Sequence, residues 1–350
     1  MYTHFALQSP SALNDLVNKR RFETKIGERV QCSHQLRNIY DAIEGSSAKY
    51  VLFGICEEIG VLANLGRPGT STAWESFLPV FLNLQSNDWF DGNEVLILGK
   101  FDFADVKDLI DKNAQTAQER MYAYRHAVNM IDEEVERLAK DITSLGKIPV
   151  ALGGGHNNAY GMIKGCAKGL AKINNTDEHP SLNVLNLDAH ADLRALEGRH
   201  SGNAFSYAKS DGFLGKYIVL GLQENYLTQT MLTEFQQNPD FEFASWESMY
   251  LRNELSFEDA VKTALYNFSN NKFGVELDMD VIENTGSSAA SPTGISFAET
   301  RKAMHLIASL GNSAYLHISE AIYKNDEKII DEYCGKKLAI LVSDFIKNNP

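Results

Sequence analysis

Short apolar segments recur along the chain, and the stretches between them place apolar residues at helical spacing. Several segments are nearly continuous in apolar residues, which is typical of strands buried on both faces of a parallel sheet. These segments begin at Lys49, Glu94, Lys147, Leu182, Tyr217, Phe273 and Ser313. We therefore expect a parallel sheet built mainly from them.

The clearest helical pattern runs from residue 118 to residue 145, where apolar residues recur every three or four positions. Similar patterns predict helices at 158–172, 256–268, 297–310 and 334–347. Because strands and helices alternate, we expect right-handed crossovers and an α/β fold, a three-layer α/β/α sandwich around a mostly parallel sheet of about eight strands.

The first 45 residues are polar and only weakly periodic, so we predict an N-terminal arm over 1–45 and a single α/β domain over 46–350. Two alternatives remain open for the arm, which is either poorly ordered or covers an edge of the sheet.

Charge and cysteine usage narrow the class of protein. The net charge of -13 argues against nucleic-acid binding, which needs basic surface, and the apolar stretches are too short to span a membrane. The four cysteines lie far apart and form no CxxC pair, so a reducing compartment is the natural interpretation. With no evident secretory signal, we expect a cytoplasmic protein.

Carboxylates and histidines follow two of the predicted strands. In LNLDAHAD, the alternation of a strand would send Asp188, His190 and Asp192 toward one face. VELDMD repeats the arrangement with Asp278 and Asp280. The alternative is that these residues are helix caps, turn residues and a surface histidine.

A third segment, LGGGHNNAYG, places His156 directly after three glycines, where the backbone can turn tightly. Phosphate binding is the rival interpretation, but Asn158 occupies the third glycine position of G-x-G-x-x-G and no P-loop lysine follows. A lone histidine here would more often be a buried structural or surface residue.

Together the three segments predict a metal centre. Four aspartates in one cleft would repel each other unless cations balanced them, and two divalent ions would supply that balance. Oxygen donors with some imidazole and no thiolate favour manganese.

In this order the segments resemble the ureohydrolase superfamily of arginases and agmatinases, with its GG-x-H, D-A-H-x-D and D-x-D motifs. The resemblance covers residues 49 to 345. NLGRPG at 64–69 also looks like the family's N-G-G-R-x-G loop, with Leu65 where glycine is usual.

The resemblance implies two Mn²⁺ ions bridged by Asp188 and Asp278. It implies that His156 and Asp192 complete one ion and that His190 and Asp280 complete the other. A water bridging the ions would be the nucleophile, and Asp280 would help by handling the proton. Relatives commonly form trimers or hexamers, so we also expect a homo-oligomer.

For the substrate, the resemblance implies that Glu320 binds the amidine or guanidinium nitrogens. We also expect His200 to take part in catalysis, and Ser201 and Asn203 to contact the substrate. His200 and its neighbour Arg199 serve either the substrate or the solvent.

Within the superfamily the chain looks most like formimidoylglutamases. It has GGGH where arginases usually have GGDH, Arg194 where they place asparagine, and Phe205 where they place a histidine. N-formimino-L-glutamate carries two carboxylates, and Arg194 would bind one of them unless it forms a structural ion pair.

The chain departs from the superfamily in two places. The segment after Asp280 lacks the D-P and P-G-T-G pattern, and Ala321-Ile322 replaces the frequent V-N-P after Glu320. Two other functions therefore stay open: a guanidino hydrolase that releases urea, and a non-catalytic subunit that keeps the fold.

Overall fold

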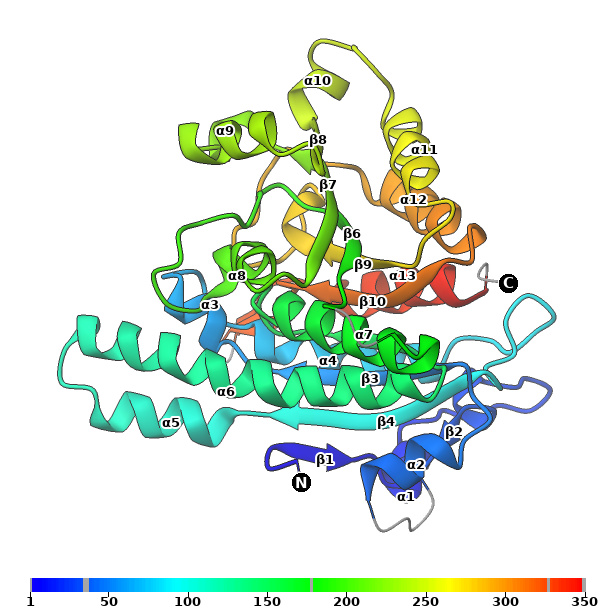
Figure 1. Ribbon diagram of the computed structural model, residues 1–350. Coiled ribbons are helices and arrows are strands. Elements are labelled where there is room, and N and C mark those ends of the chain that lie inside the picture. Colours follow the sequence, from blue (N-terminus) through cyan, green and yellow to red (C-terminus); the bar gives the residue numbers. More distant parts are fainter. Residues whose placement is uncertain (1, 34–37, 177–178, 326–327, 348–350) are drawn as a thin grey trace.

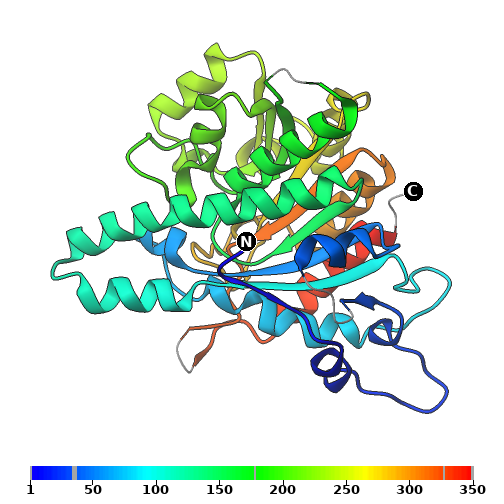
Figure 2. The ribbon, with the colours of Figure 1, turned by 60° about the horizontal axis from the view of Figure 1, so that its bottom comes forward.

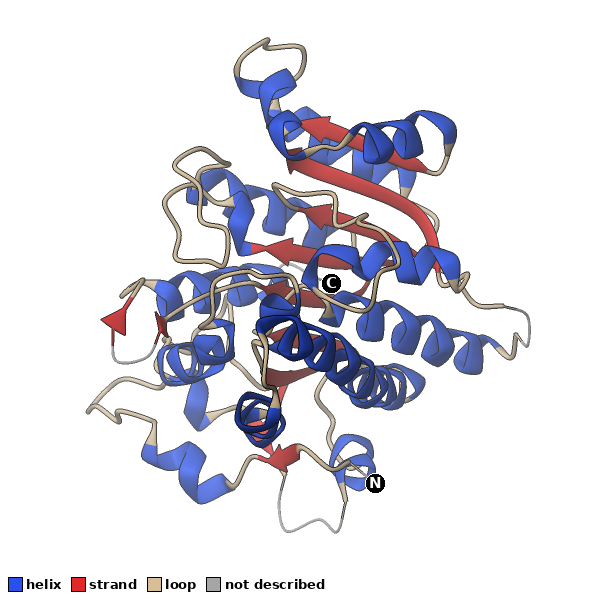
Figure 3. Cartoon of the chain, turned by 90° about the vertical axis from the view of Figure 1, so that its left-hand side faces the viewer, coloured by secondary structure: helices blue, strands red, loops and turns tan. Residues whose placement is uncertain are grey.

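A computed structural model describes residues 2–33, 38–176, 179–325 and 328–347. One large twisted sheet runs through the chain, with helices on both of its faces (Figures 1 and 3). From one edge to the other, the strand order is β1-β4-β3-β5-β10-β9-β6-β7-β8, and β2 pairs with β4 off this path. The three-layer α/β/α prediction is confirmed.

The strands that form the parallel part of the sheet match the apolar segments closely. Their bounds are β3 Tyr50–Cys56, β4 Val95–Asp102, β5 Ile148–Leu152, β6 Leu182–Leu187, β7 Leu214–Leu222, β8 Phe241–Ser245, β9 Phe273–Asp278 and β10 Ser313–Ser319. These eight strands are mutually parallel. The sequence pattern missed β8, an edge strand in which only the two end residues are fully buried.

The described part of the N-terminal segment lies along the β4 edge, where the blue chain runs beside the cyan strand (Figure 2). Strand β1, Phe5–Leu7, pairs antiparallel with β4, and β2, Gln31–Cys32, pairs parallel with it. These two strands raise the sheet to ten.

The helices divide into two layers, each with its own apolar core. One layer contains α1 Pro10–Asp15, α4 Ala73–Leu82, α10 Trp246–Tyr250, α11 Phe257–Asn267, α12 Phe297–Ser309 and α13 Cys334–Lys347. The other contains α2 Ile39–Glu44, α3 Ile59–Ala63, α5 Ala104–Asn113, α6 Ala117–Ser144, α7 Asn158–Asn174, α8 Ala204–Ser210 and α9 Gln229–Gln237. A separate hairpin joins β11 Lys324–Asn325 to β12 Lys328–Ile329.

Strand β3 shows why continuous apolar runs are needed. Tyr50 and Leu52 belong to the core of the first layer, whereas Val51 and Phe53 belong to the core of the second. Each strand residue is therefore buried whichever face it points to. No helix in the described residues combines the length and apolar character needed to cross a bilayer.

Candidate metal centre

His156 sits in a tight turn between β5 and α7. Gly153 and Gly154 have φ of +93° and +71°, and a Cβ on Gly154 would lie 2.9 Å from Glu57 Oε1. The fully buried carboxylate of Glu57 accepts hydrogen bonds from the Gly155 N–H at 2.7 Å and from Asn158 Nδ2 at 2.7 Å. Burial raises the pKa of Glu57. This carboxylate thereby fixes the glycine turn that carries His156.

Asp188, His190 and Asp192 lie in the loop that follows β6. The strand ends at Leu187, and Asp192 has a left-handed φ of +46°, so strand alternation is not what brings these residues together. The prediction that the alternation of a strand directs these three residues to one face is wrong. Convergence comes instead from the loop, in which Asp188 Oδ1 accepts the His190 N–H at 2.7 Å.

Asp278 is the last residue of β9, and Asp280 lies in the 3₁₀ helix η5, Met279–Val281. Asp278 caps this helix by accepting the Asp280 N–H at 2.7 Å. Asp280 Oδ1 accepts the Ala289 N–H at 3.0 Å. Capping therefore does occur here, and it leaves other carboxylate oxygens of both residues directed at the histidines.

Four of the expected ligands meet at His156. Its Nδ1 lies 2.9 Å from Asp192 Oδ2, and it lies 3.2 Å from both Asp188 Oδ2 and Asp278 Oδ2. One ligand atom from each of the four residues lies within 4.8 Å of all the others. This is the donor set that the family resemblance assigns to one metal ion.

The remaining pair lies next to the first set. His190 Nδ1 is 3.6 Å from Asp188 Oδ1 and 3.8 Å from Asp280 Oδ2. Asp188 thus presents one oxygen to His156 and the other to His190. The His190 ring stacks on Tyr226 with ring centroids 4.8 Å apart.

The electrostatics of this cluster favour a cation. Burial lowers the pKa of His156, but the carboxylates of Asp188 and Asp192, with their neighbours, raise it well above its usual range. Burial, together with repulsion from Asp280 and Asp188, raises the pKa of Asp278 well above its usual range. Among the described residues, neither ring nitrogen of His156 makes a hydrogen bond. A buried donor set with unmet bonds and crowded negative charge fits divalent ions.

A cavity of about 400 Å³ opens beside the cluster. Its walls include Asn64, Asp192, Arg194, Ser201, Tyr226, Thr228, Asp278, Asp280, Ser288 and Glu320. Glu320 is 2% exposed and has a left-handed φ of +62°. Its Oε1 accepts the His156 N–H at 2.6 Å, whereas its Oε2 has no hydrogen-bond partner among the described residues. One carboxylate oxygen is therefore available at the cavity wall.

Two residues expected at the substrate site lie elsewhere. Buried His200 caps a 3₁₀ helix, where its Nδ1 accepts the Gly202 N–H at 3.1 Å, and it does not line the cavity. Asn203 uses its amide within the loop, accepting from Arg199 Nη1 at 2.8 Å and donating to Gly198 O at 2.8 Å. These positions favour a structural role for both side chains, because neither faces the cavity.

Arg199 is also removed from the cavity. It is 2% exposed, forms a bidentate pair with Asp132 at 2.8 and 3.2 Å, and lies between the rings of Tyr160 and Tyr207. Arg199 was expected to contact either the substrate or the solvent, and the structure shows neither contact. Its Nη2 donates to the Asn157 carbonyl at 2.9 Å, so it braces the turn next to His156.

Residues 48–338 match a family model described as the arginase family. The chain belongs to the arginase family. The sequence resemblance that predicted this membership is therefore confirmed, over nearly the same residues.

Among curated relatives of this arginase-family chain is the formimidoylglutamase of Streptococcus pyogenes serotype M3, 28% identical over 207 residues. That match covers 57% of this chain and 55% of the relative, so the chain matches little more than half of the relative's length.

Solved structures resemble the whole arginase-family fold. A formimidoylglutamase from Bacillus subtilis superposes with a TM-score of 0.69 at 18% identity, covering 95% of this chain and 93% of that one. Trypanosoma cruzi formiminoglutamase, solved with Mn²⁺, gives 0.67 at 17%, covering 94% and 100%. An arginase from Bacillus subtilis gives 0.64 at 16%, covering 85% and 98%. At these identities the likeness establishes the fold.

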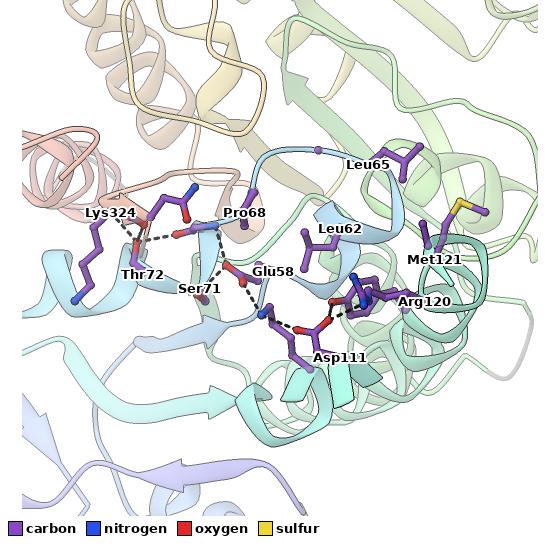
Figure 4. Close-up of a pocket in the computed structure, with 16 residues that line it drawn as sticks. Glu58, Leu62, Leu65, Pro68, Ser71, Thr72, Asp111, Arg120, Met121 and Lys324 are labelled. Carbon is purple, nitrogen blue, oxygen red and sulfur yellow. Dashed lines mark hydrogen bonds and ion pairs between the residues drawn. The ribbon is translucent and has the colours of Figure 1, made fainter. Parts of the chain in front are cut away.

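The loop at 64–69 also lines a second, larger cavity of about 630 Å³ (Figure 4), and Gly66 lies in the walls of both cavities. Charged groups in the larger cavity are paired with each other, as in the contacts of Lys107 Nζ with Glu58 at 3.5 Å and Asp111 at 3.1 Å. Glu58 also accepts the Gly69 N–H at 2.7 Å. These contacts hold the loop at 64–69. At the start of the same loop, Asn64 accepts a hydrogen bond from Arg194 at 2.6 Å.

Sequence reasoning missed several buried polar residues that surround the expected ligands, among them Glu57, Asn186, Glu276 and His317. A signal for three of them was present. Asn186, Glu276 and His317 are polar residues within largely apolar strands, and a buried polar residue in a central strand needs a partner.

Proposed function

We propose that this chain is a metal-dependent hydrolase of a C–N amidine bond that converts N-formimino-L-glutamate and water into L-glutamate and formamide. The observation that carries the proposal is the convergence of His156, Asp188, Asp192 and Asp278 beside His190 and Asp280. Relatives named formimidoylglutamase support the choice of substrate.

The same six residues would hold two Mn²⁺ ions, with Asp188 and Asp278 shared between them. Four aspartates carry four negative charges, which two divalent ions neutralise, and the oxygen-rich donor set without thiolate suits manganese. When bound, such ions lower the pKa of a water and stabilise developing negative charge.

Glu320 would bind the amidine. Its unpartnered Oε2 is buried at the cavity wall, where an N–H of the substrate can donate to it. Its other oxygen is held by the His156 N–H. Because both contacts involve one carboxylate, the substrate carbon would be placed at a fixed distance from the ligand His156.

Asp280 would transfer a proton from the attacking water to the leaving nitrogen. It lies in the cavity wall with its Oδ1 held by the Ala289 N–H. The attacking water loses a proton as its oxygen bonds to the amidine carbon. A carboxylate beside that carbon can carry this proton to the glutamate nitrogen as the C–N bond breaks, so that the amine leaves in neutral form. The second proton of the water leaves the new hydroxyl group as the carbonyl of formamide forms, and the amidine nitrogen takes it up to give the amide NH₂.

Arg194 would select an anionic substrate. It is the one lysine or arginine among the described residues that line the cavity. Half of its side chain is exposed, and Nη1 donates to Asn64 at 2.6 Å, which holds the guanidinium at the rim. Ser201 and Thr228 supply hydroxyl groups for the second carboxylate.

The test is a substrate panel with Mn²⁺-loaded protein, assayed for formamide, urea and ammonia. Glutamate and formamide in equal amounts from N-formimino-L-glutamate are expected. Urea from arginine, agmatine or a guanidino acid would replace this proposal with a guanidino hydrolase. Two bound metals with no turnover of any substrate would favour the non-catalytic subunit.

A further inference from the structure

A row of buried polar side chains crosses the sheet beneath the metal centre. Asn186 on β6 is in register with Glu276 on β9, which is in register with His317 on β10. All three residues have no exposed surface. Glu276 and His317 lie two positions before the last residues of their strands, and Asn186 lies two positions before Asp188, which directly follows its strand. A buried charge is costly unless its partners compensate, so this row needs a specific reason.

Glu276 is the centre of the row. Its Oε1 accepts a hydrogen bond from the Tyr315 hydroxyl at 2.6 Å, and its Oε2 lies 2.7 Å from His317 Nδ1. Gly274 makes room for this arrangement, because a Cβ there would lie 2.3 Å from the Tyr315 ring. Two donors from β10 therefore fix the orientation of the Glu276 carboxylate.

The same Oε2 atom of Glu276 faces the candidate ligand His156. It lies 3.5 Å from Nε2 of the imidazole, on the side opposite to Nδ1 and its aspartates. A histidine that ligates through Nδ1 carries its proton on Nε2. A carboxylate facing that proton fixes the tautomer and the ring plane and strengthens the ligand.

Asn186 contacts another proposed ligand, the carboxylate of Asp188. Its Nδ2 donates to Asp188 Oδ2 at 3.0 Å and to the Tyr217 hydroxyl at 3.0 Å. The Tyr217 hydroxyl in turn donates to the Ala191 carbonyl at 3.0 Å, within the ligand loop. The buried row thus contacts a ligand from the turn after β5 and a ligand from the loop after β6.

We propose that Glu276 is a positioning residue of the metal centre, which holds His156 with Nδ1 toward the ions and thereby sets their affinity. Tyr315 and His317 hold Glu276 for this task. The inference rests on the proposed metal-binding function of His156, and it adds a residue that does not itself ligate.

The experiment measures Mn²⁺ affinity by calorimetric titration of the metal-free protein and its variants. Glu276→Gln keeps the side-chain volume and removes the charge, and we expect the dissociation constant to rise about 10- to 100-fold. Asp344→Asn is the matched control. Asp344 is also a buried carboxylate paired with a cation, Arg301 at 2.7 Å, but it lies on α13 and does not line the cavity. We expect it to lower the melting temperature while leaving Mn²⁺ affinity unchanged.

A second variant keeps the test decisive if Glu276→Gln fails to fold. Tyr315→Phe removes one hydrogen bond to Glu276 and keeps the ring, so we expect the Mn²⁺ dissociation constant to rise roughly two- to tenfold. Wild-type affinity in both variants, or in Tyr315→Phe alone when the other does not fold, would overturn the inference. Absence of Mn²⁺ binding by the wild-type protein would instead contradict the proposed function.

Discussion

Glu320 accepts a hydrogen bond from the main-chain N–H of His156 at 2.6 Å, although the two residues are 164 positions apart in the chain. The contact ties the carboxylate proposed to bind the amidine to the backbone of a proposed metal ligand. Any movement of the glycine turn that carries His156 therefore moves both groups together.

Glu320→Gln tests this link. The neutral amide can keep the hydrogen bond to the His156 N–H but loses the charge that would pair with an amidinium. Losing one partner of a buried charge pair costs about 2 kcal/mol or more, so we expect kcat/KM to fall at least roughly 30-fold. Mn²⁺ content should stay at the wild-type level. A variant with wild-type kcat/KM would remove Glu320 from the substrate site.

Arg194→Ala should act on recognition. Its guanidinium lies at the cavity rim, away from the cluster, so we expect KM for N-formimino-L-glutamate to rise about 10- to 100-fold with little change in kcat. Steady-state kinetics of Arg194→Ala and Arg194→Lys separate charge from geometry, with the lysine variant recovering part of the loss. An unchanged KM in the alanine variant would indicate that Arg194 is a structural residue.

Removal of metal should destabilise the fold. Without cations, Asp188, Asp192, Asp278 and Asp280 remain close together in buried surroundings. Ligand binding to the folded state raises stability by mass action, so we expect a lower melting temperature after chelation and recovery on adding Mn²⁺. Calorimetry of both forms checks this. Equal melting temperatures would argue that the cluster binds no ion.

The stabilisation by Mn²⁺ should grow with pH. Burial raises the pKa of Glu320 to about 8, with repulsion from Asp280 adding to the effect. Burial lowers the pKa of His190, but Asp188 outweighs this and raises it to about 10. Groups with raised pKa values stabilise the metal-free fold below their unfolded pKa, and that stability is lost as pH rises through the folded pKa. For Glu320 this stability is lost between pH 4.5 and about pH 8, and for His190 it is lost between pH 6.5 and about pH 10.

Bound metal would replace the proton of His190, and its positive charge would disfavour the proton of nearby Glu320, so the loss should be confined to the metal-free form. We expect the difference in melting temperature between the two forms to be larger at about pH 8.5 than at about pH 6. A difference that shrinks with rising pH would show that these groups do not face the ions.

The Arg199–Asp132 pair supports the turn next to His156 from outside the cavity. Breaking a buried ion pair by removing one partner costs about 3–5 kcal/mol, so Asp132→Asn should lower the free energy of unfolding by an amount in that range. Chemical denaturation of the metal-free protein measures it. A loss below about 1 kcal/mol would mean that Tyr160 and Tyr207, which cover the guanidinium, suffice to hold it.

The sequence predicted the layers well because apolar patterning follows directly from burial. Helix α6 begins and ends one residue from its predicted bounds, since a capping box at Thr116 marks its start and its apolar residues from Tyr124 to Ile142 are buried in the second core. Helix α5 was missed because none of its residues is fully buried. Pro79 lies inside α4, where a proline normally argues against a helix.

Within the site, residue identity could be predicted but orientation could not. The three glycines before His156 predict a tight turn there, whereas the left-handed backbone at Asp192 could not be predicted because no glycine occupies that position. His200 and Asn203 fall in the expected loop, yet their bonds to Gly202 and Arg199 turn them away from the cavity. Only tertiary contacts decide which side of a loop a polar residue faces.

The central claim is that two cations are held by the six residues around Asp188, and metal analysis tests it most directly. Wild-type protein and Asp188→Asn, both dialysed after exposure to excess Mn²⁺, are compared by elemental analysis per mole of chain. We expect two Mn²⁺ per wild-type chain and less than one in the variant, because Asp188 offers one oxygen to each histidine. Wild-type protein that retains no Mn²⁺, or a variant that retains as much as the wild type, would contradict the claim.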